Sequence, residues 1–226
     1  MTRAWALVCC IALVTVALAD GPRVVIISVD GLRADAISPG VTPVMAALRE
    51  RGTRARQALC DLPTATLTNH ASMLTGLSAR EHGLRLNVDL PGRIPELTLF
   101  DHATAAGRRC AFLASKTKLG YLAPPEVLEV RVTNGSPQSI TAQALELITA
   151  GEIDVLFLHF NDPDSTGHRE GWMSAGYLEA AGLMDALVGE ITAAIDADAT
   201  RDTWLILTAD HGGLGVTHLL NLPEIR

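Results

Sequence analysis

The sequence has few aromatic residues and no excess of positive charge. Of its 226 residues only 4% are aromatic, and 18 Lys and Arg stand against 25 Asp and Glu, so the formal net charge is −7. Without a basic stripe, binding to the phosphate backbone of a nucleic-acid polymer is not expected. The length and a hydrophobic content of 48% suit one domain with a sizeable core rather than two.

Cysteine is also scarce, and half of the cysteines lie close to the N-terminus. Cys9 and Cys10 fall in the first twenty residues, which leaves Cys60 and Cys110 in the rest of the chain. An oxidising compartment would permit a disulfide between these two. They are equally well explained as two separate thiols, because no pattern in the sequence sets their distance.

The first nineteen residues have the layout of a signal peptide. Arg3 supplies positive charge, residues 4–17 are apolar apart from Thr15, and Ala17-Leu18-Ala19 fits a cleavage site. The apolar run is short for a membrane span. We therefore expect a signal peptide over 1–19, export to the periplasm or out of the cell, and a mature domain over 20–226 with no stable membrane span.

Apolar runs and amphipathic segments alternate along the mature chain. Apolar, mostly β-branched or aliphatic runs predict strands at 24–29, 110–114, 153–160 and 204–208, with a further strand at 54–59. Helices are expected from Thr42-Pro43 to Gly52 and at 68–74, 97–106, 139–150 and 177–195. This order is typical of an α/β fold with a doubly wound, mostly parallel sheet and helices on both faces.

Polar clusters follow three of the predicted strands. Asp30 ends the run at 24–29, the segment from Asp164 to His168 follows the run at 153–160, and Asp210-His211 follows the run at 204–208. The carboxyl ends of parallel strands meet at one edge of a sheet, where α/β proteins bind ligands. We therefore expect the three clusters to form one site.

These clusters carry the donor atoms of a metal site. Asp164 and His168 are four residues apart in a loop shaped by Pro163 and Gly167, so both side chains can face one cation. Mixed Asp and His ligation suits zinc better than calcium or magnesium. Taken alone, an acid before a glycine, such as Asp30, is often only a turn former.

A candidate nucleophile lies in the hydroxyl-rich segment 63–73, where a predicted helix begins. Backbone N–H groups and the positive end of the helix dipole favour an alkoxide and a bound phosphate at such a point. The alternative is that these hydroxyls only cap the helix. Direct coordination to a metal would lower the pKa of one hydroxyl and make it a nucleophile.

The ordered segments VDGLRAD, PTATLTNHASMLTG, REHG, PDSTGH and TADHGG resemble the type I phosphodiesterase/nucleotide pyrophosphatase branch of the alkaline phosphatase superfamily. The likeness extends from residue 24 to residue 213. It implies that Thr66 is the nucleophile, which forms a phospho-threonine, and that Asn69 contacts the phosphoryl oxygens.

The same resemblance implies two Zn²⁺ ions that clamp an in-line displacement. The first would be held by Asp30, Thr66, Asp210 and His211. The second would be held by Asp164 and His168.

Other positive and imidazole side chains allow a site role or a structural one. The segment 115–120 resembles one that sulfatases of the same superfamily place in their sites, so Lys116 and Lys118 would contact a phosphate oxygen or a leaving group; otherwise they are solvated lysines. His70 either supports the nucleophile or only packs. His159 is expected to be a structural core histidine, because it lies within an apolar strand.

The resemblance also implies a final His ligand for the second zinc, and the chain ends at Arg226 without one in the expected place. His218 is an alternative ligand. We expect the C-terminal part of the fold to be missing and the second zinc site to be incomplete. The predicted function is zinc-dependent hydrolysis of a phosphodiester or pyrophosphate bond in a small phosphoester. The alternatives are a phosphomonoesterase of the same superfamily or a catalytically impaired relative that binds metal or phosphate.

Overall fold

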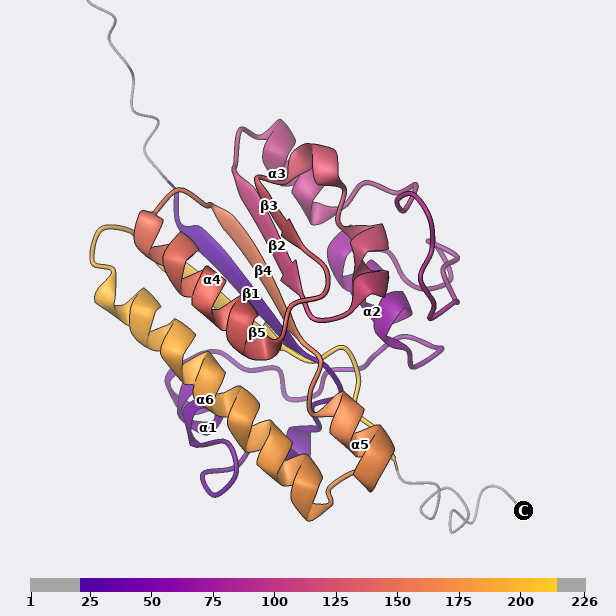
Figure 1. Cartoon of the computed structure of the whole chain (residues 1–226), viewed down its shortest axis with the longest axis vertical. Helices are drawn as coiled ribbons and strands as arrows, with labels where there is room; N and C mark the ends of the chain where they lie inside the picture. Colours follow the sequence, from indigo (N-terminus) through magenta and orange to yellow (C-terminus); the bar gives the residue numbers. More distant parts are fainter. Residues whose placement is uncertain (1–20, 215–226) are drawn as a thin grey trace, which may run out of the picture.

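The computed structural model describes residues 21–214, which fold around a five-stranded parallel sheet. The strands are β1 (Arg23–Val29), β2 (Cys110–Ala114), β3 (Val130–Val132), β4 (Val155–Phe160) and β5 (Thr203–Thr208). Their order across the sheet is β3-β2-β4-β1-β5, and all neighbouring strands are parallel (Figure 1). The predicted α/β class with a parallel sheet is therefore confirmed.

The two central strands, β1 and β4, are apolar along almost their whole length. β1 reads RVVIISV and β4 reads VLFLHF, and each has a neighbouring strand on both sides. Val25, Ile27 and Val29 pack into one core cluster, whereas Ile26 packs into the cluster on the opposite face. A strand that is buried on both faces needs such a continuous apolar run, which is why the sequence predicts both strands.

Helices cover both faces of the sheet. One face packs against α1 (Pro43–Arg51), α4 (Pro137–Ala150) and α6 (Ala175–Ala197), and the other packs against α2 (Thr66–Thr75) and α3 (Leu99–Ala105). Figure 1 shows α4 and α6 lying across one side of the sheet, with α2 and α3 grouped beside β2 and β3. The expected doubly wound arrangement is therefore present.

Shorter elements complete the described chain. The helix α5 (Asp164–Glu170) lies at the end of the sheet where β1 and β4 finish, and the Asp164 N–H donates to the Asp30 carbonyl at 3.0 Å. The 3₁₀ helices are η1 (Ala34–Ala36), η2 (Thr117–Leu122) and η3 (Pro125–Val127). They lie in the connections that follow β1 and β2.

Three local predictions differ from the structure. Residues 54–59 form no strand and are all exposed, because the stretch RARQAL offers no apolar face to bury. Residues 164–168, expected as a loop, belong to α5 (Asp164–Glu170), which starts directly after Pro163. The strand β3 was not predicted because it is a three-residue edge strand that is largely accessible to solvent.

The described part of the chain also bears on the cysteines and on the membrane. Cys60 is exposed and Cys110 is buried in β2, and both are free thiols rather than a disulfide. Within residues 21–214 no helix has the length and apolar character that a bilayer crossing requires. The predicted signal peptide over 1–19 and the alternative ligand His218 lie outside the described residues.

Candidate active site

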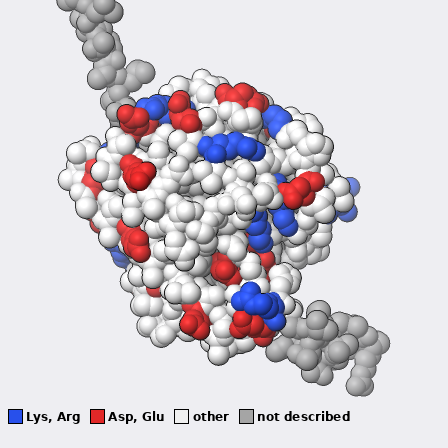
Figure 2. Space-filling view, viewed as in Figure 1, with Lys and Arg blue, Asp and Glu red and all other residues white. Residues whose placement is uncertain are grey.

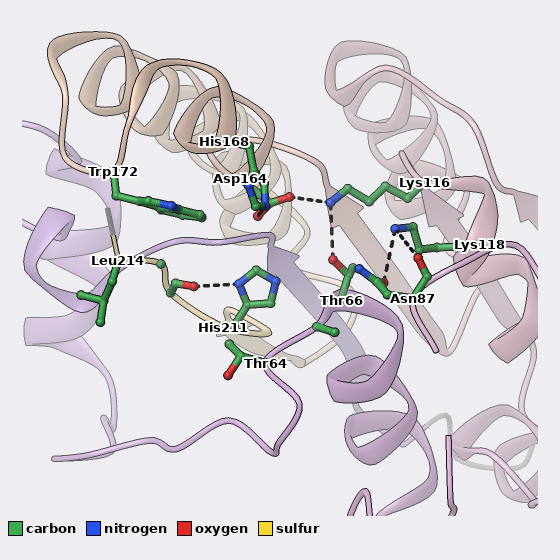
Figure 3. A pocket seen from close by; sticks show the side chains of 13 residues that line it. Thr64, Thr66, Asn87, Lys116, Lys118, Asp164, His168, Trp172, His211 and Leu214 are labelled. Atoms are coloured by element: carbon green, nitrogen blue, oxygen red, sulfur yellow. Dashed lines mark hydrogen bonds and ion pairs between the residues drawn. The ribbon is translucent and has the colours of Figure 1, made fainter. Parts of the chain in front are cut away.

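A pocket of about 420 Å³ opens at the carboxyl edge of the sheet, where α2 also begins (Figure 3). Side chains from several distant segments line it, among them Thr64, Thr66, Asn87, Lys116, Lys118, Asp164, His168, Trp172 and His211. Asp30 and Asp210 are buried next to these side chains. The three polar clusters of the sequence thus meet in one place, as the strand ends predicted.

Asp30 is the first residue after β1 and is fully buried. Its Oδ2 accepts a hydrogen bond from His159 Nε2 at 3.1 Å and lies 2.6 Å from Lys116 Nζ. Burial raises the pKa of this carboxyl, but the His159 hydrogen bond and the charge of Lys116 outweigh burial and hold the pKa well below its usual range. Asp30 is therefore an anion at neutral pH.

Asp210 and His211 follow β5, the strand next to β1. Together with Asp30 they offer ligand atoms that all lie within 4.8 Å of one another. Nδ1 of His211 donates to the Gly212 carbonyl at 2.8 Å, so Nε2 keeps its lone pair, 3.6 Å from Asp30 Oδ1 and 3.4 Å from Asp210 Oδ2. A histidine that ligates a metal through Nε2 needs this tautomer.

Three carboxylate oxygens at this site are buried and have no hydrogen-bond partner among the described residues. They are Asp30 Oδ1, Asp164 Oδ1 and Asp210 Oδ2. Buried oxygens of this kind are rare in native proteins. Burial and the nearby charge of Asp30 also raise the pKa of Asp210 well above its usual value.

These oxygens fit bound divalent cations, which would give each oxygen a partner and would favour the ionised form of Asp210. Their combination with imidazole nitrogens is characteristic of zinc rather than of magnesium or calcium.

Thr66 is the first residue of α2, and its buried hydroxyl faces this cluster. The N-cap residue is Ala65, which makes no side-chain cap hydrogen bond, and the Thr66 hydroxyl points to Asp30 rather than to the N–H groups of its own helix. Its Oγ1 lies 3.4 Å from Asp30 Oδ2 and 3.5 Å from Lys116 Nζ. The positive end of the α2 dipole lies at the same point and favours an anion there.

The other candidate metal pair lies on α5. Asp164 is buried, whereas the His168 side chain is 71% exposed, and Oδ1 of Asp164 lies 3.4 Å from Nε2 of His168. The two residues are four apart on a helix and therefore share one face. The structure brings them together as the spacing predicted, on a helix rather than on a loop.

Lys116 and Lys118 both reach the pocket. Lys116 Nζ lies 2.6 Å from Asp30 Oδ2 and 2.7 Å from Asp164 Oδ2, so one ammonium group joins the two candidate metal clusters. Lys118 Nζ lies 3.3 Å from Asn87 Oδ1, and burial together with the charge of Lys116 lowers the pKa of Lys118. Both lysines therefore have partners at the pocket, and their contact with a phosphate oxygen or a leaving group stays a prediction.

Two asparagines lie near the start of α2, and only Asn69 was expected in the site. The Asn69 amide is buried against backbone: Oδ1 accepts from the Asp61 N–H at 2.6 Å and Nδ2 donates to the Ala65 carbonyl at 3.1 Å. Asn87 lines the pocket instead, and its Oδ1 accepts from the Leu67 N–H at 3.1 Å. Asn87 lies in the long irregular segment between α2 and α3, which has no periodic pattern that could have indicated its position.

Two buried histidines support the site. His159 Nδ1 faces the Ser115 N–H at 3.4 Å, so Nε2 carries the proton that it donates to Asp30. His70 Nδ1 donates to the Thr66 carbonyl at 2.8 Å, and burial followed by the neighbouring His159 lowers the pKa of His70 to about 3. His159 is buried as expected, yet its partner is a candidate metal ligand, so it belongs to the site.

The amino-acid sequence is similar to those of known proteins. A family model described as type I phosphodiesterase / nucleotide pyrophosphatase matches residues 24–225. Ectonucleotide pyrophosphatase/phosphodiesterase family member 1 of Mus musculus is 28% identical over 220 residues, which cover 85% of this chain and 24% of that protein. Venom phosphodiesterase 2 of Crotalus adamanteus is 27% identical over 219 residues, which cover 83% of this chain and 26% of that protein. The chain therefore spans about a quarter of the length of these relatives.

Solved structures share the fold. Murine ectonucleotide pyrophosphatase / phosphodiesterase 5, an inactive variant in complex with AMP, matches with a TM-score of 0.70 at 23% identity over 84% of this chain and 57% of that chain. Phosphonoacetate hydrolase from Sinorhizobium meliloti 1021, in complex with phosphonoformate, matches with a TM-score of 0.65 at 21% identity over the same shares, 84% and 57%. At these identities the likeness establishes the fold alone.

Proposed function

The chain belongs to the type I phosphodiesterase/nucleotide pyrophosphatase family of the alkaline phosphatase superfamily, and we propose that it hydrolyses a phosphodiester or pyrophosphate bond through a covalent intermediate on Thr66. The observation that carries this proposal is the buried Thr66 hydroxyl, which lies at the start of α2 and 3.4 Å from Asp30. Asp210 and His211 stand beside that carboxylate. A hydroxyl nucleophile next to a cation site is the arrangement that phosphoryl transfer uses.

Two zinc ions are the proposed cofactors. Asp30, Asp210 and His211, together with Thr66, would hold the first, and Asp164 with His168 would hold the second. Zinc, when bound, supplies Lewis acidity that lowers the pKa of a hydroxyl or a water and offsets charge on the transferring group. The donor set supports this assignment, because three buried carboxylates face the site and Lys116 alone cannot balance them.

Thr66 is the proposed nucleophile. Its Oγ forms a bond to phosphorus while the bond from phosphorus to the leaving oxygen breaks, and attack by water on the phosphorylated threonine then restores the hydroxyl. The neutral His70 ring binds the Thr66 carbonyl at 2.8 Å and so fixes the residue at the start of the helix. Such positioning is a large part of the catalytic effect in two-step transfers.

Lys116, Lys118 and Asn87 are the proposed ligands of the phosphoryl oxygens. Lys116 Nζ lies 3.5 Å from Thr66 Oγ1, close enough to meet an oxygen of a group bonded to that atom. Lys118 and Asn87 are in mutual contact on the adjacent wall (Figure 3). Asn69, which the family resemblance suggests for this role, would first have to release its backbone partners.

A phosphomonoesterase is the second candidate, and the two lysines are the observation that favours it. A monoester dianion carries more negative charge than a diester, and Lys116 with Lys118 supplies two positive groups at the pocket. The size of the pocket, about 420 Å³, suits a small phosphoester.

The surface charge bears on the size of the substrate. Figure 2 shows basic side chains interspersed with acidic ones and no continuous basic area on that face, which supports a substrate other than a nucleic-acid polymer. The signal-peptide layout of residues 1–19 supports export of the chain.

Hydrolysis of bis(p-nitrophenyl) phosphate and of p-nitrophenyl phosphate by the zinc-loaded chain tests the proposal. We expect Thr66→Ala to lower kcat/KM by about 10³-fold or more, with most bound zinc retained because Asp30, Asp210 and His211 remain. Thr66→Ser keeps a hydroxyl and should retain far more activity. Hydrolysis that survives Thr66→Ala unchanged would contradict the nucleophile. A wild-type chain that binds zinc and turns over neither ester would support the impaired, metal-binding relative.

A further inference from the structure

Three glycines from separate segments pack against one side chain, Trp172. Gly31 is the second residue after β1, Gly167 lies within α5, and Gly213 ends the TADHGG segment. Each of these glycines lies within two residues of a proposed metal ligand. Trp172 is partly buried and lines the pocket (Figure 3).

We propose that Trp172 is a positioning residue, whose indole ring sets the separation between α5 and the segment 210–213 and thereby holds the two pairs of metal ligands in place. The proposal rests on the proposed function in one respect, namely that these residues bind zinc. It adds to the site a residue that is not itself a proposed metal ligand.

The distances show how closely the ring fits. A Cβ added at Gly213 would lie 2.0 Å from Cε2 of Trp172, and one at Gly167 would lie 2.9 Å from Cε3. Contacts this short are not tolerated in a packed interior. A Cβ added at Gly31 would lie 2.8 Å from Cα of Asp164 and 3.0 Å from Cη2 of Trp172, so the ring is only part of what confines that glycine. Gly167 and Gly213 do not have positive φ angles, so at these two positions the indole ring, and not the backbone conformation, requires glycine.

The backbone turn that presents the ring is itself strained. Trp172 lies between Gly171, at φ 95°, and Met173, at φ 61°. A residue with a Cβ is disfavoured in the left-handed region, so surrounding packing must hold the turn. Trp172 and Met173 both pack against the core on this face of the sheet, and the Trp172 ring centroid lies 5.6 Å from that of the buried Tyr177.

The ring also contacts a ligand directly. The His168 imidazole meets Trp172 edge-on, with centroids 5.5 Å apart and an interplanar angle of 72°. His168 is otherwise largely exposed, so this contact restricts the orientation of a side chain that solvent would leave free. The same ring therefore orients His168 and, through Gly213, supports the segment that carries Asp210 and His211.

Zinc affinity of the full chain, measured by competition with a chromogenic chelator, tests the proposal. We expect Trp172→Ala to weaken zinc binding by about 10-fold to 100-fold, the effect typical of residues that orient metal ligands. Trp172→Phe keeps an aromatic ring and should recover most of the loss. Trp204→Phe is the matched control, because Trp204 is 66% exposed near the amino end of β5, and it should leave zinc affinity unchanged.

A double substitution separates positioning from a general loss of structure. Gly213→Ala should weaken zinc binding because its methyl group overlaps the ring, and Gly213→Ala combined with Trp172→Ala should bind zinc more tightly than Gly213→Ala alone. Thermal unfolding without metal confirms that each variant is folded. Wild-type affinity in Trp172→Ala, or a double variant no better than Gly213→Ala, would overturn the proposal. A wild-type chain that binds no zinc would overturn the proposed function, and this positioning role with it.

Discussion

The two halves of the candidate site differ in how the fold holds them. Asp30 is fully buried after the central strand β1, and Asp210 with His211 follows the neighbouring strand β5. The other half lies on α5, a helix of only seven residues, and the His168 side chain there is 71% exposed. The ligands of the first half are therefore fixed by the same packing that forms the core, whereas those of the second depend on a short helix at the surface.

The surroundings of the two halves differ in the same way. His159 and His70 lie behind the first half, both fully buried and both hydrogen-bonded. The second half has Trp172 as its aromatic support and Lys116 as its link to Asp30. We therefore expect one tightly bound and one weakly bound zinc in this chain.

The largest effect should follow from removing a ligand of the buried half. Asp30→Asn takes away the carboxylate that contacts Lys116 and His159 and that would bind the first proposed zinc, so we expect loss of the tight zinc and a fall in kcat/KM of about 10³-fold or more. Zinc content after dialysis and steady-state hydrolysis are the measurements.

The matched variant Asp164→Asn makes the comparison, because it changes the same functional group in the other half. It should release only the weak zinc and keep the tight one. If both variants lose the same zinc, or if Asp164→Asn loses more zinc than Asp30→Asn, the first half does not bind zinc more tightly than the second.

A smaller effect is expected from the residue behind Asp30. His159→Leu removes the hydrogen bond that Nε2 donates to Asp30 at 3.1 Å, and such a change lowers metal affinity by about 10-fold to 100-fold. The loss should fall on the tight zinc alone. His102→Leu on the exposed side of α3 is the control. Equal effects of the two substitutions on zinc affinity would show that His159 does not support the metal ligand Asp30.

The smallest predicted effect concerns pH and His70. The pKa of this histidine is lowered from its ordinary value of 6.5 to about 3 by burial and by the neighbouring His159. Between these values the unfolded chain binds a proton that the folded chain does not, so the free energy of unfolding falls as the pH drops below 6.5. The loss from this group between pH 6.5 and pH 5 should be about 2 kcal/mol.

Chemical denaturation at several pH values, in the presence of a chelator, measures this effect. His70→Gln stays neutral throughout, so its stability should decline less steeply than that of the wild type over the same interval. Parallel curves for the two proteins would show that His70 is not held neutral by its buried position.

Most of the sheet and the place of the site could be predicted from the sequence because both depend on local patterns. The apolar runs at β1 and β4 are nearly continuous, whereas a half-buried strand would alternate apolar and polar residues. Each run is followed by polar residues at the carboxyl edge of the sheet. Residues 54–59 were wrongly expected to form a strand, because a short stretch of mixed character does not show whether a partner strand is available.

Other parts of the site depend on contacts that no local pattern records. Asn87 reaches the pocket from an irregular segment, and Trp172 is directed inward by a turn with positive φ at Met173. His159 lies in an apolar strand, and only the pairing of β4 with β1 shows that it is next to Asp30. Long-range register and side-chain orientation decide these positions, and neither follows from sequence spacing.

Detection of a covalent intermediate on Thr66 tests the proposed mechanism most directly. The zinc-loaded chain is mixed with bis(p-nitrophenyl) phosphate for less than one turnover, quenched in acid, digested and analysed by mass spectrometry. We predict a p-nitrophenyl phosphoryl group on the peptide that contains Thr66, formed with release of one p-nitrophenolate and absent from Thr66→Ala. Release of p-nitrophenolate by the wild-type chain with no such group on Thr66, or with the group on another residue, would contradict Thr66 as the nucleophile.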